Sequence, residues 1–327
     1  MTKRFTEDEL IARLFAPIAG AAGLGLKDDA AFLPLGGAKI VATVDALVAG
    51  VHFFPDDPPA AIAKKALRVN LSDLAAKGAQ PKGFLLALAL PADWTNDWLA
   101  AFAAGLGEDA AAFGCPLIGG DTVATPGPLT VSITAVGEAP KGRFVSRSGA
   151  KPGDALFVSG TIGDAALGLR LRQGEISRDM LSAAARARLM GRYLLPEPRL
   201  ALAPALRDHA GAAMDVSDGL VGDLEKLLHA SNVAARVHVE DIPLSTAARE
   251  AIELQPSLFE TVMTGGDDYE ILCCAGGADA GALQNRAEVC GAPLSRIGDI
   301  IPGPPGAAFC DREGKIINFN HKSFSHF

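Results

Sequence analysis

The chain has 327 residues, of which 49% are hydrophobic and 21% charged, and its formal net charge is -8. This length and composition indicate a globular protein with material for two domains, and the acidic balance argues against a nucleic-acid partner, which would select a basic face. The sequence has no apolar run near the roughly 20 residues that span a bilayer and starts without the apolar stretch of a signal peptide, so we expect a cytoplasmic protein with no membrane partner.

The first part of the chain shows strand and helix patterns in alternation. Apolar runs with strand character end at polar residues or proline, and alanine-rich stretches carry apolar residues at helical spacing. Strands are predicted over 39–44, 83–90 and 129–136, and helices over 60–77 and 94–113. The connections between them are short, which favours a compact α+β domain over residues 1–140.

The second part begins after residues 137–153, which are rich in glycine, proline, serine and basic side chains. Such a composition is typical of a domain junction. A strand at 155–159, a glycine-bearing loop and a helix at 164–172 follow, and further helical patterns lead to a buried strand at 269–275. We therefore predict a C-terminal domain over 148–327.

Aspartates recur where the backbone is expected to turn, in apolar or glycine-rich surroundings. They include Asp29, Asp45, Asp73, Asp121, Asp215, Asp218 and Asp267. A carboxylate in such surroundings is costly unless a positive group lies beside it, and few basic residues are near in sequence. Mg²⁺ prefers oxygen ligands and shares its remaining positions with water and phosphates. The pattern therefore predicts a metal and phosphate site.

Each motif taken alone has a plainer interpretation. Asp29 could terminate a loop, Asp73 could pair with Lys77 on a solvated helix face, and Asp218 could cap the helix that follows it. His52 could be a packed loop histidine. A metal-stabilised binding module without turnover, in which the aspartates hold Mg²⁺ or Ca²⁺ structurally, is the corresponding non-enzymatic hypothesis.

Motifs of the familiar nucleotide-binding folds are missing from the sequence. There is no G-x-x-x-x-G-K-[ST] loop, no H-R-D or D-F-G set and no G-x-S-x-G elbow. In phosphoryl transfer, alignment of the reactants and neutralisation of oxygen charge lower most of the barrier, and clustered cations can provide both. A metal-dependent phosphoryl transferase outside those folds fits the pattern.

Seven stretches of sequence, taken in order, carry a resemblance to a known family. They cover residues 27–31, 45–53, 65–79, 117–122, 147–154, 215–220 and 265–270, with N-L-S-D at 70–73 and D-V-S-D-G at 215–219. Through them the chain resembles the thiamine-monophosphate kinase family, within the aminoimidazole ribonucleotide synthetase-like superfamily. The resemblance implies Mg²⁺-dependent transfer of the ATP γ-phosphoryl group to thiamine monophosphate, giving thiamine diphosphate. An ATP-dependent synthetase of the same superfamily is the rival enzyme hypothesis.

The resemblance also implies roles for individual residues. The implied metal ligands, to several Mg²⁺ ions, are Asp29, Thr43, Asp45, Asp73, Asp121, Asp215 and Asp218. The implied ATP contacts are Gly120, Asp121, Arg147 and Ser217, with Asp121 and Arg147 as catalytic residues. The implied substrate contacts are His52, Asp267 and His321, where His321 or Phe324 takes the place of a tryptophan that is common in the family.

The fold implied by the resemblance has two domains and a site in the cleft between them. The sheet of the N-terminal α+β domain is expected to pair with that of a second subunit in a homodimer, and the C-terminal domain is expected to be α/β. One departure from the family pattern lies in the first motif, where Lys27 replaces a usual glycine.

Overall fold

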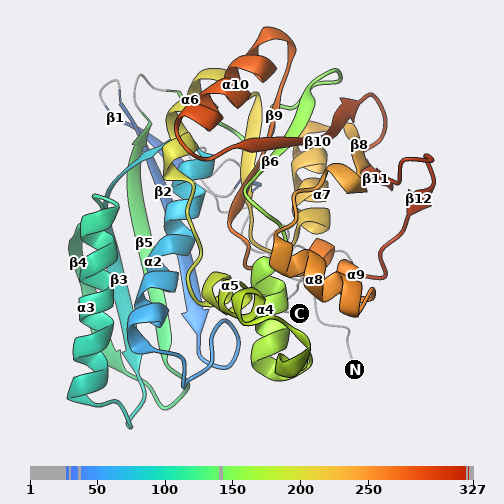
Figure 1. The fold of residues 1–327 in the computed structure, drawn as a ribbon. Coiled ribbons are helices and arrows are strands. Elements are labelled where there is room, and N and C mark those ends of the chain that lie inside the picture. Colours follow the sequence, from blue (N-terminus) through green and yellow to red (C-terminus); the bar gives the residue numbers. More distant parts are fainter. Residues whose placement is uncertain (1–26, 29–30, 36–37, 140–142, 322, 324–327) are drawn as a thin grey trace, which may run out of the picture.

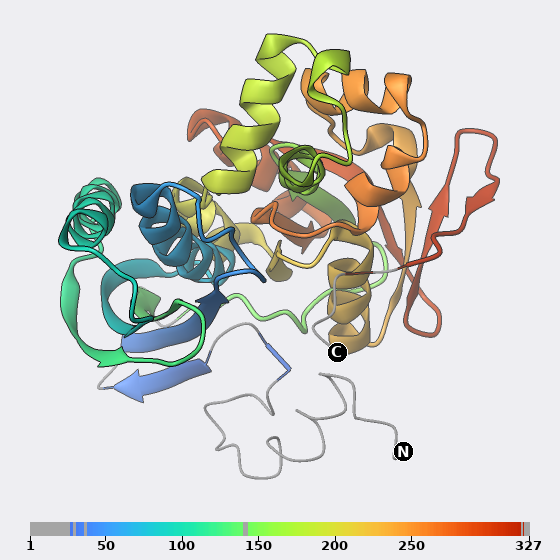
Figure 2. The same cartoon turned by 90° about the horizontal axis from the view of Figure 1, so that it is seen from below.

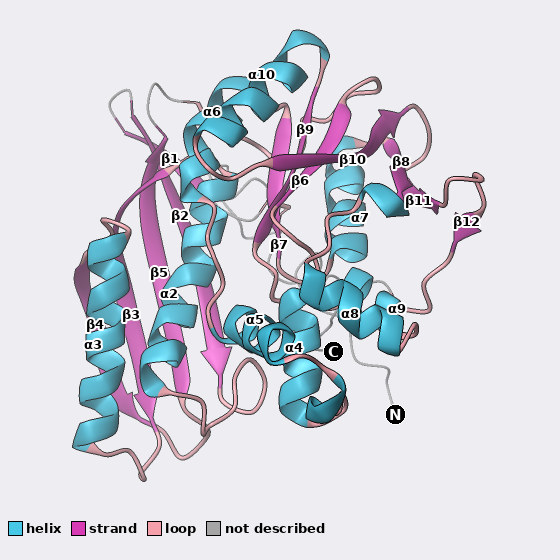
Figure 3. Cartoon of the chain, in the orientation of Figure 1, coloured by secondary structure: helices cyan, strands magenta, loops and turns pink. Residues whose placement is uncertain are grey.

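The computed structural model describes residues 27–28, 31–35, 38–139, 143–321 and 323. The described strands form two sheets, one from the first part of the chain and one from the second, and each sheet carries its own helices (Figure 1, Figure 3). The predicted α+β organisation is therefore confirmed. No helix in these residues is long and apolar enough to cross a membrane.

The first sheet has five described strands in the order β1-β2-β5-β3-β4. They are β1 (Ala31–Leu35), β2 (Ala38–Val48), β3 (Gln80–Leu90), β4 (Leu117–Ala124) and β5 (Thr130–Ala139). Neighbouring strands are antiparallel except β3 and β4, which are parallel. Helices α2 (Pro59–Ala76) and α3 (Asn96–Ala112) cover one face, shown in blue and teal in Figure 2. Leu67, Phe84 and Ile133 belong to the core between helices and sheet.

Strand β4 differs from the turn expected at Gly119, Gly120 and Asp121. The segment is extended and pairs with β3, placing Gly120 opposite Leu86 and Asp121 opposite Ala87. A Cβ atom on Gly120 would lie 2.0 Å from the Leu86 carbonyl oxygen. The glycine thus serves close approach between two backbones, a use that the sequence pattern of a turn does not distinguish.

The opposite face of this sheet is apolar and exposed in the described chain. Val44, Leu85 and Val123 on three different strands are 61%, 43% and 50% exposed. Asp121 lies on this same face, because strand alternation puts it with Val123 two residues on. Monomeric proteins rarely expose contiguous apolar surface of this kind, so the face has the character of an interface.

The second sheet has seven described strands in the order β12-β11-β8-β10-β6-β9-β7. They are β6 (Ala155–Ser159), β7 (Ala212–Val216), β8 (Ala234–His238), β9 (Glu270–Ala275), β10 (Leu294–Ile301), β11 (Gly306–Cys310) and β12 (Ile316–Ile317). Strands β6, β7 and β9 are buried along their whole length, as expected for strands covered on both faces.

Helices lie on both faces of the second sheet. One core includes side chains of α4 (Asp164–Gln173), α5 (Ala183–Leu194), α7 (Leu220–Ser231), α8 (Thr246–Leu254) and α9 (Leu258–Thr264). The other includes side chains of α6 (Ala203–His209) and α10 (Gly277–Val289). Short 3₁₀ turns occupy Arg178–Met180, Leu200–Leu202 and Val239–Asp241. This layered arrangement agrees with the implied α/β character of the C-terminal half.

Helix α2 belongs to the cores of both halves. Leu67 and Leu71 lie in the core of the first sheet, whereas Ala75 and Ala76 lie in a core with residues of β6 and β9. Its small alanines permit close approach to the second sheet. The helix therefore fixes how the two sheets face each other, and the predicted division into residues 1–140 and 148–327 stays a prediction.

Candidate active site

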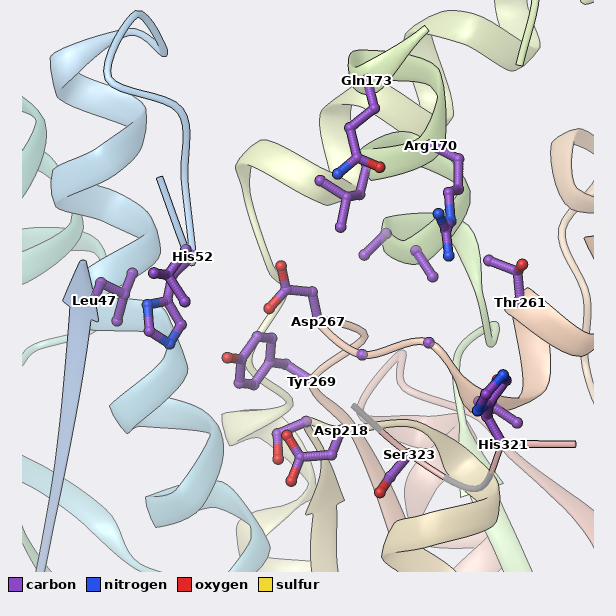
Figure 4. A pocket seen from close by; sticks show the side chains of 18 of the residues that line it. Leu47, His52, Arg170, Gln173, Asp218, Thr261, Asp267, Tyr269, His321 and Ser323 are labelled. Carbon is purple, nitrogen blue, oxygen red and sulfur yellow. The ribbon is translucent and has the colours of Figure 1, made fainter. Parts of the chain in front are cut away.

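A cavity of about 860 Å³ lies between the two halves. Its walls come from the end of β2, the loop after it, α4, α9 and the segments around Asp218, Asp267 and His321. Figure 4 shows His52 on one side, with Asp267, Tyr269 and Asp218 across from it. Segments far apart in sequence therefore meet at one hollow, as the predicted cleft requires.

His52 is held by its own loop. Its Nδ1 atom accepts the main-chain N–H of Val48 at 3.0 Å, which leaves Nε2 as the ring atom that carries the proton of the neutral imidazole. The carbonyl oxygen of His52 accepts a hydrogen bond from Lys65 Nζ at 3.0 Å. The half-buried ring is thus fixed in orientation where it lines the cavity.

Asp267 lies in a tight turn that joins α9 to β9. Its φ of 74° and the φ of 51° at Tyr269 are unusual for residues other than glycine. The main-chain N–H groups of these two residues donate to Ser217 and Val216 carbonyl oxygens, each at 2.8 Å. Lys65 Nζ lies 2.6 Å from Asp267 Oδ2. The turn is therefore held by β7 and by α2 together.

Asp45, Asp73 and Asp215 have raised pKa values because of burial and the charges of neighbouring carboxylates. Burial, with the negative charge of Asp218, raises the pKa of Asp45 to about 6. Burial also raises the pKa of Asp215 to about 6, and the hydrogen bond from Ser72 opposes this shift only in part. The pKa of Asp73 lies well above its usual value because of burial and the charges of Asp215 and Asp45.

Neutral groups lie around these carboxylates, and the charge of Lys77 offsets the raised pKa values of Asp73 and Asp215 only in part. Thr43 donates its hydroxyl hydrogen to Asp73 Oδ2, and the main-chain N–H of Asp45 donates to Asn70 Oδ1 at 3.1 Å. Asp218 is different, since Lys226 Nζ lies 2.5 Å from its Oδ2 atom. Carboxylates repel one another strongly where they are shielded from water, and a bound divalent cation relieves this repulsion.

The carboxylates are near one another but do not form a finished coordination shell. In the part of the chain that the structure describes, no three His, Cys, Asp or Glu side chains converge tightly enough to hold a metal ion as they stand. Asp29 lies outside the described residues. A cation here would need side-chain rotation and ligands from water or phosphate, which is usual for Mg²⁺.

Six predicted site residues that the structure describes do not line this cavity: Thr43, Asp73, Gly120, Asp121, Arg147 and Asp215. Gly120 and Asp121 lie on β4, three strands away from β2, with Asp121 on the open face of the sheet. Arg147 lies in the segment between the halves, and its main-chain N–H donates to Asp28 Oδ2 at 2.9 Å. Asp28 in turn pairs with the fully buried Lys77 at 2.8 Å, which anchors the first motif to α2.

The remaining predicted residues agree better in position. Ser217 and Asp218 follow β7 and line the cavity, as does His321, which is exposed near its rim. Sequence reasoning missed Arg170 and Thr261 in the lining and Lys65 behind it. Lys65 lies inside a motif that carried the resemblance, so a signal existed for it; Arg170 and Thr261 have no such signal.

Comparisons with known proteins follow the same division of the chain. Residues 27–139 match the family model for the N-terminal domain of AIR synthase related proteins, and residues 151–311 match the model for the C-terminal domain. The thiamine-monophosphate kinase of Caulobacter vibrioides is 45% identical over 93% of this chain and 86% of its own length. That of Escherichia coli K12 is 39% identical over 98% of both chains.

The chain belongs to the thiamine-monophosphate kinase family. A solved structure described as AaThiL complexed with AMPPCP and TMP superposes with a TM-score of 0.87 at 30% identity, covering 100% of both chains. The thiamine-monophosphate kinase of Stenotrophomonas maltophilia superposes with a TM-score of 0.78 at 42% identity, covering 89% of this chain and 90% of that one. The family and fold class predicted from the motifs are confirmed.

Proposed function

We propose that this member of the thiamine-monophosphate kinase family transfers the γ-phosphoryl group of ATP to thiamine monophosphate, giving thiamine diphosphate. One observation carries the proposal: His52, Asp267 and His321 line the same cavity as Asp45, Asp218 and Ser217. The predicted substrate contacts and the predicted metal and phosphate contacts thus line one cavity. The relative solved with AMPPCP and TMP, similar over its full length, supports this assignment.

The proposed substrate contacts suit a cationic ring with a phosphate tail. Thiamine carries a fixed positive charge on its thiazolium ring and hydrogen-bond donors on its pyrimidine, and the Asp267 carboxylate complements both. His52 lines the other side of the cavity, and its ring is held in a fixed orientation by the Val48 N–H. His321 at the rim offers a planar ring on which the substrate can stack.

We assign the metal site to Asp29, Thr43, Asp45, Asp73, Asp121, Asp215 and Asp218. The elevated pKa values of Asp45, Asp73 and Asp215, which arise from burial and from the charges of neighbouring carboxylates, fit a site that takes up divalent cations. Bound Mg²⁺ would neutralise phosphate charge and align the two phosphates. The donor set is all oxygen, which suits Mg²⁺ rather than a softer metal.

The other predicted residues position nucleotide. Ser217 stands at the cavity next to Asp218 and can donate to a phosphate oxygen, and Arg147 carries a planar fork suited to the charge that develops during transfer. With both phosphates held in line, direct transfer requires no covalent intermediate on the protein.

A homodimer accounts for the position of Asp121. Within one chain Asp121 lies on the open face of the first sheet, away from the cavity, and that face is apolar at Val44, Leu85 and Val123. Packing two such faces together would bury the apolar surface and bring Asp121 and Gly120 toward the partner's site. We propose that these two residues act across the dimer, and that the dimer is cytoplasmic.

The proposal is tested by incubating purified protein with ATP, Mg²⁺ and thiamine monophosphate and separating the thiamine phosphates by chromatography. We expect thiamine diphosphate and ADP in equal amounts, with no product when Mg²⁺ is chelated. ADP formation that does not depend on thiamine monophosphate would overturn the proposal. Binding of Mg²⁺ without any turnover would favour a metal-stabilised binding module instead.

A further inference from the structure

Lys65 is a buried cation on helix α2, behind the wall of the cavity and facing the second half of the chain. Its side chain is 3% exposed, and its Nζ atom donates to Asp267 Oδ2 at 2.6 Å and to the His52 carbonyl oxygen at 3.0 Å. The same Nζ atom lies 4.6 Å from the centre of the Tyr193 ring. One ammonium group therefore touches two of the three residues assigned to the substrate.

Both halves of the molecule meet at this ammonium group. Lys65 and His52 belong to the first half, whereas Asp267 and Tyr193 belong to the second. A buried ammonium loses the stabilisation that water provides. Hydrogen bonds and charge pairing must replace it, and this requirement constrains the groups that make them. The distance between the His52 loop and the Asp267 carboxylate is consequently set by Lys65.

The groups around Lys65 are themselves held in place. Tyr193 donates its hydroxyl hydrogen to Asp57 Oδ2 at 2.7 Å, and Asp57 also accepts from Phe54 N–H at 2.9 Å. Arg172 Nε, from α4, lies 3.2 Å from Asp57 Oδ1. Side chains of the second half thus hold the loop that carries His52, so Lys65 contacts a loop that is already fixed in position.

The Asp267 backbone gives the side-chain contact particular weight. With a φ of 74°, the residue is in a conformation that non-glycine residues rarely adopt. The main chain is tied to Ser217, but the direction of the carboxylate depends on Lys65, which holds Oδ2. Removing the ammonium leaves a partly buried carboxylate free to turn away from the cavity.

We propose that Lys65 is a positioning residue for recognition of the thiamine ring, acting through Asp267 and the His52 loop rather than through ATP. This inference rests on the proposed function, because it assigns Asp267 and His52 to the substrate. Lys65 itself does not line the cavity, so it shapes the site without touching the reacting atoms.

The test compares Lys65→Met with Lys64→Met. Lys64 is the preceding residue on α2 and pairs with the exposed Glu108 at 2.7 Å, away from the cavity. We expect Lys65→Met to raise the KM for thiamine monophosphate roughly 30-fold, the lower end of the cost of truncating a buried charge pair. The KM for ATP should stay within about twofold, Lys64→Met should behave as wild type, and Lys65→Arg should recover part of the loss.

A double-mutant cycle shows whether Lys65 acts through Asp267. The Lys65→Met/Asp267→Asn protein no longer contains an unpaired buried carboxylate, so it also tests whether loss of the fold explains the single variant. We expect it to bind thiamine monophosphate no more weakly than Asp267→Asn alone. Additive losses of affinity for thiamine monophosphate in the cycle would overturn the inference. An equal rise in the KM for ATP and the KM for thiamine monophosphate in Lys65→Met would also overturn it.

Calorimetric titration with thiamine monophosphate in the absence of ATP separates this inference from the function on which it rests. Wild-type binding without turnover would overturn the proposed kinase activity, while the Lys65 comparison could still be made on binding affinity. Wild-type turnover with unchanged substrate binding in Lys65→Met would overturn only the role of Lys65.

Discussion

At the scale of single residues, the aspartates of the candidate site are held where burial and neighbouring negative charges disfavour their ionised form. The order of motifs predicts Asp45, Asp73 and Asp215 as site residues, and in the structure burial and neighbouring carboxylates raise the pKa of each of them. The sequence could not predict how the nearby lysines are used. Lys65 pairs with Asp267, whereas Lys77 pairs with Asp28 and its charge also lowers the pKa values of Asp73 and Asp215 in part.

Asp73→Asn should greatly reduce turnover without weakening the metal-free fold. Burial and the charges of Asp215 and Asp45 raise the pKa of Asp73 and disfavour its charged form without metal, and a neutral amide of similar size removes that cost. We expect turnover to fall roughly 10²- to 10³-fold, as for the loss of one charge-stabilising group in other enzymes. The melting temperature with chelator present should change little.

The exposed Asp97→Asn substitution in the first turn of α3 provides the control for that comparison. It should leave both turnover and melting temperature unchanged. If Asp73→Asn unfolded the metal-free protein, the aspartate would have a structural role and the metal assignment would be wrong.

Asp215 should make the metal-free protein less stable as pH rises. Its pKa is about 6 in the folded state and 3.8 as a model value, so the folded chain holds the proton to higher pH than the unfolded chain. The stabilising contribution is complete below pH 3.8 and is lost as pH rises to about 6. Asp215→Asn should then stabilise the chelated protein at neutral pH, on the order of 3 kcal/mol.

Thermal melts with chelator across the range from roughly pH 4.5 to 7.5 check this prediction. The gain in melting temperature of Asp215→Asn over wild type should shrink toward the acidic end. A gain that is constant with pH would contradict the assigned cause, and saturating Mg²⁺ should reverse the ranking by stabilising only the wild type.

At the scale of elements, the sequence predicted those whose signal is local. The strand patterns at 39–44 and 83–90 correspond to β2 and β3, and the helical patterns at 60–77 and 94–113 correspond to α2 and α3. Strand β4 was missed because Gly119 and Gly120 have the composition of a turn. Their use depends on how close β3 comes, and this close approach is a tertiary contact that no local pattern records.

Gly120→Ala should separate β4 from β3. The new Cβ atom would meet the Leu86 carbonyl oxygen at 2.0 Å, and backbone atoms on both strands would have to move. We expect a loss of about 2 kcal/mol or more in unfolding free energy, measured by urea denaturation, together with loss of turnover.

Gly107→Ala is the matched substitution on α3, where a Cβ atom meets nothing within 4 Å. It should stabilise the protein by about 0.5–1 kcal/mol, since alanine is the better helix former. Equal changes in unfolding free energy for Gly120→Ala and Gly107→Ala would show that the close approach of β4 to β3 does not contribute to stability.

At the scale of the whole molecule, the role that we propose for Asp121 depends on the proposed homodimer. Strand alternation puts Asp121 on the open face, and only the register of β4 on β3 reveals this. The sequence predicts Asp121 as a site residue but could not tell that it lies away from Asp45 within one chain. A partner subunit is the economical way to unite them.

Mixed dimers should restore activity lost in each parent. Asp121→Asn keeps the cavity cluster intact, and Asp73→Asn keeps Asp121 intact, so a heterodimer contains one complete site. After mild denaturation and mixing of the two inactive proteins at equal ratio, we expect about a quarter of wild-type activity. No recovery in heterodimers verified by mass spectrometry would place Asp121 outside the partner's site.

Helix α2, whose two ends belong to different cores, limits how the enzyme can admit and release its ligands. A hinge motion that pulled the two sheets apart would tear Ala75 and Ala76 from the core that they share with β6 and β9. Such a motion would expose apolar surface at considerable cost. Entry and exit must therefore depend on local rearrangement of the cavity rim, near His321, and turnover would be gated by a small segment rather than by domain opening.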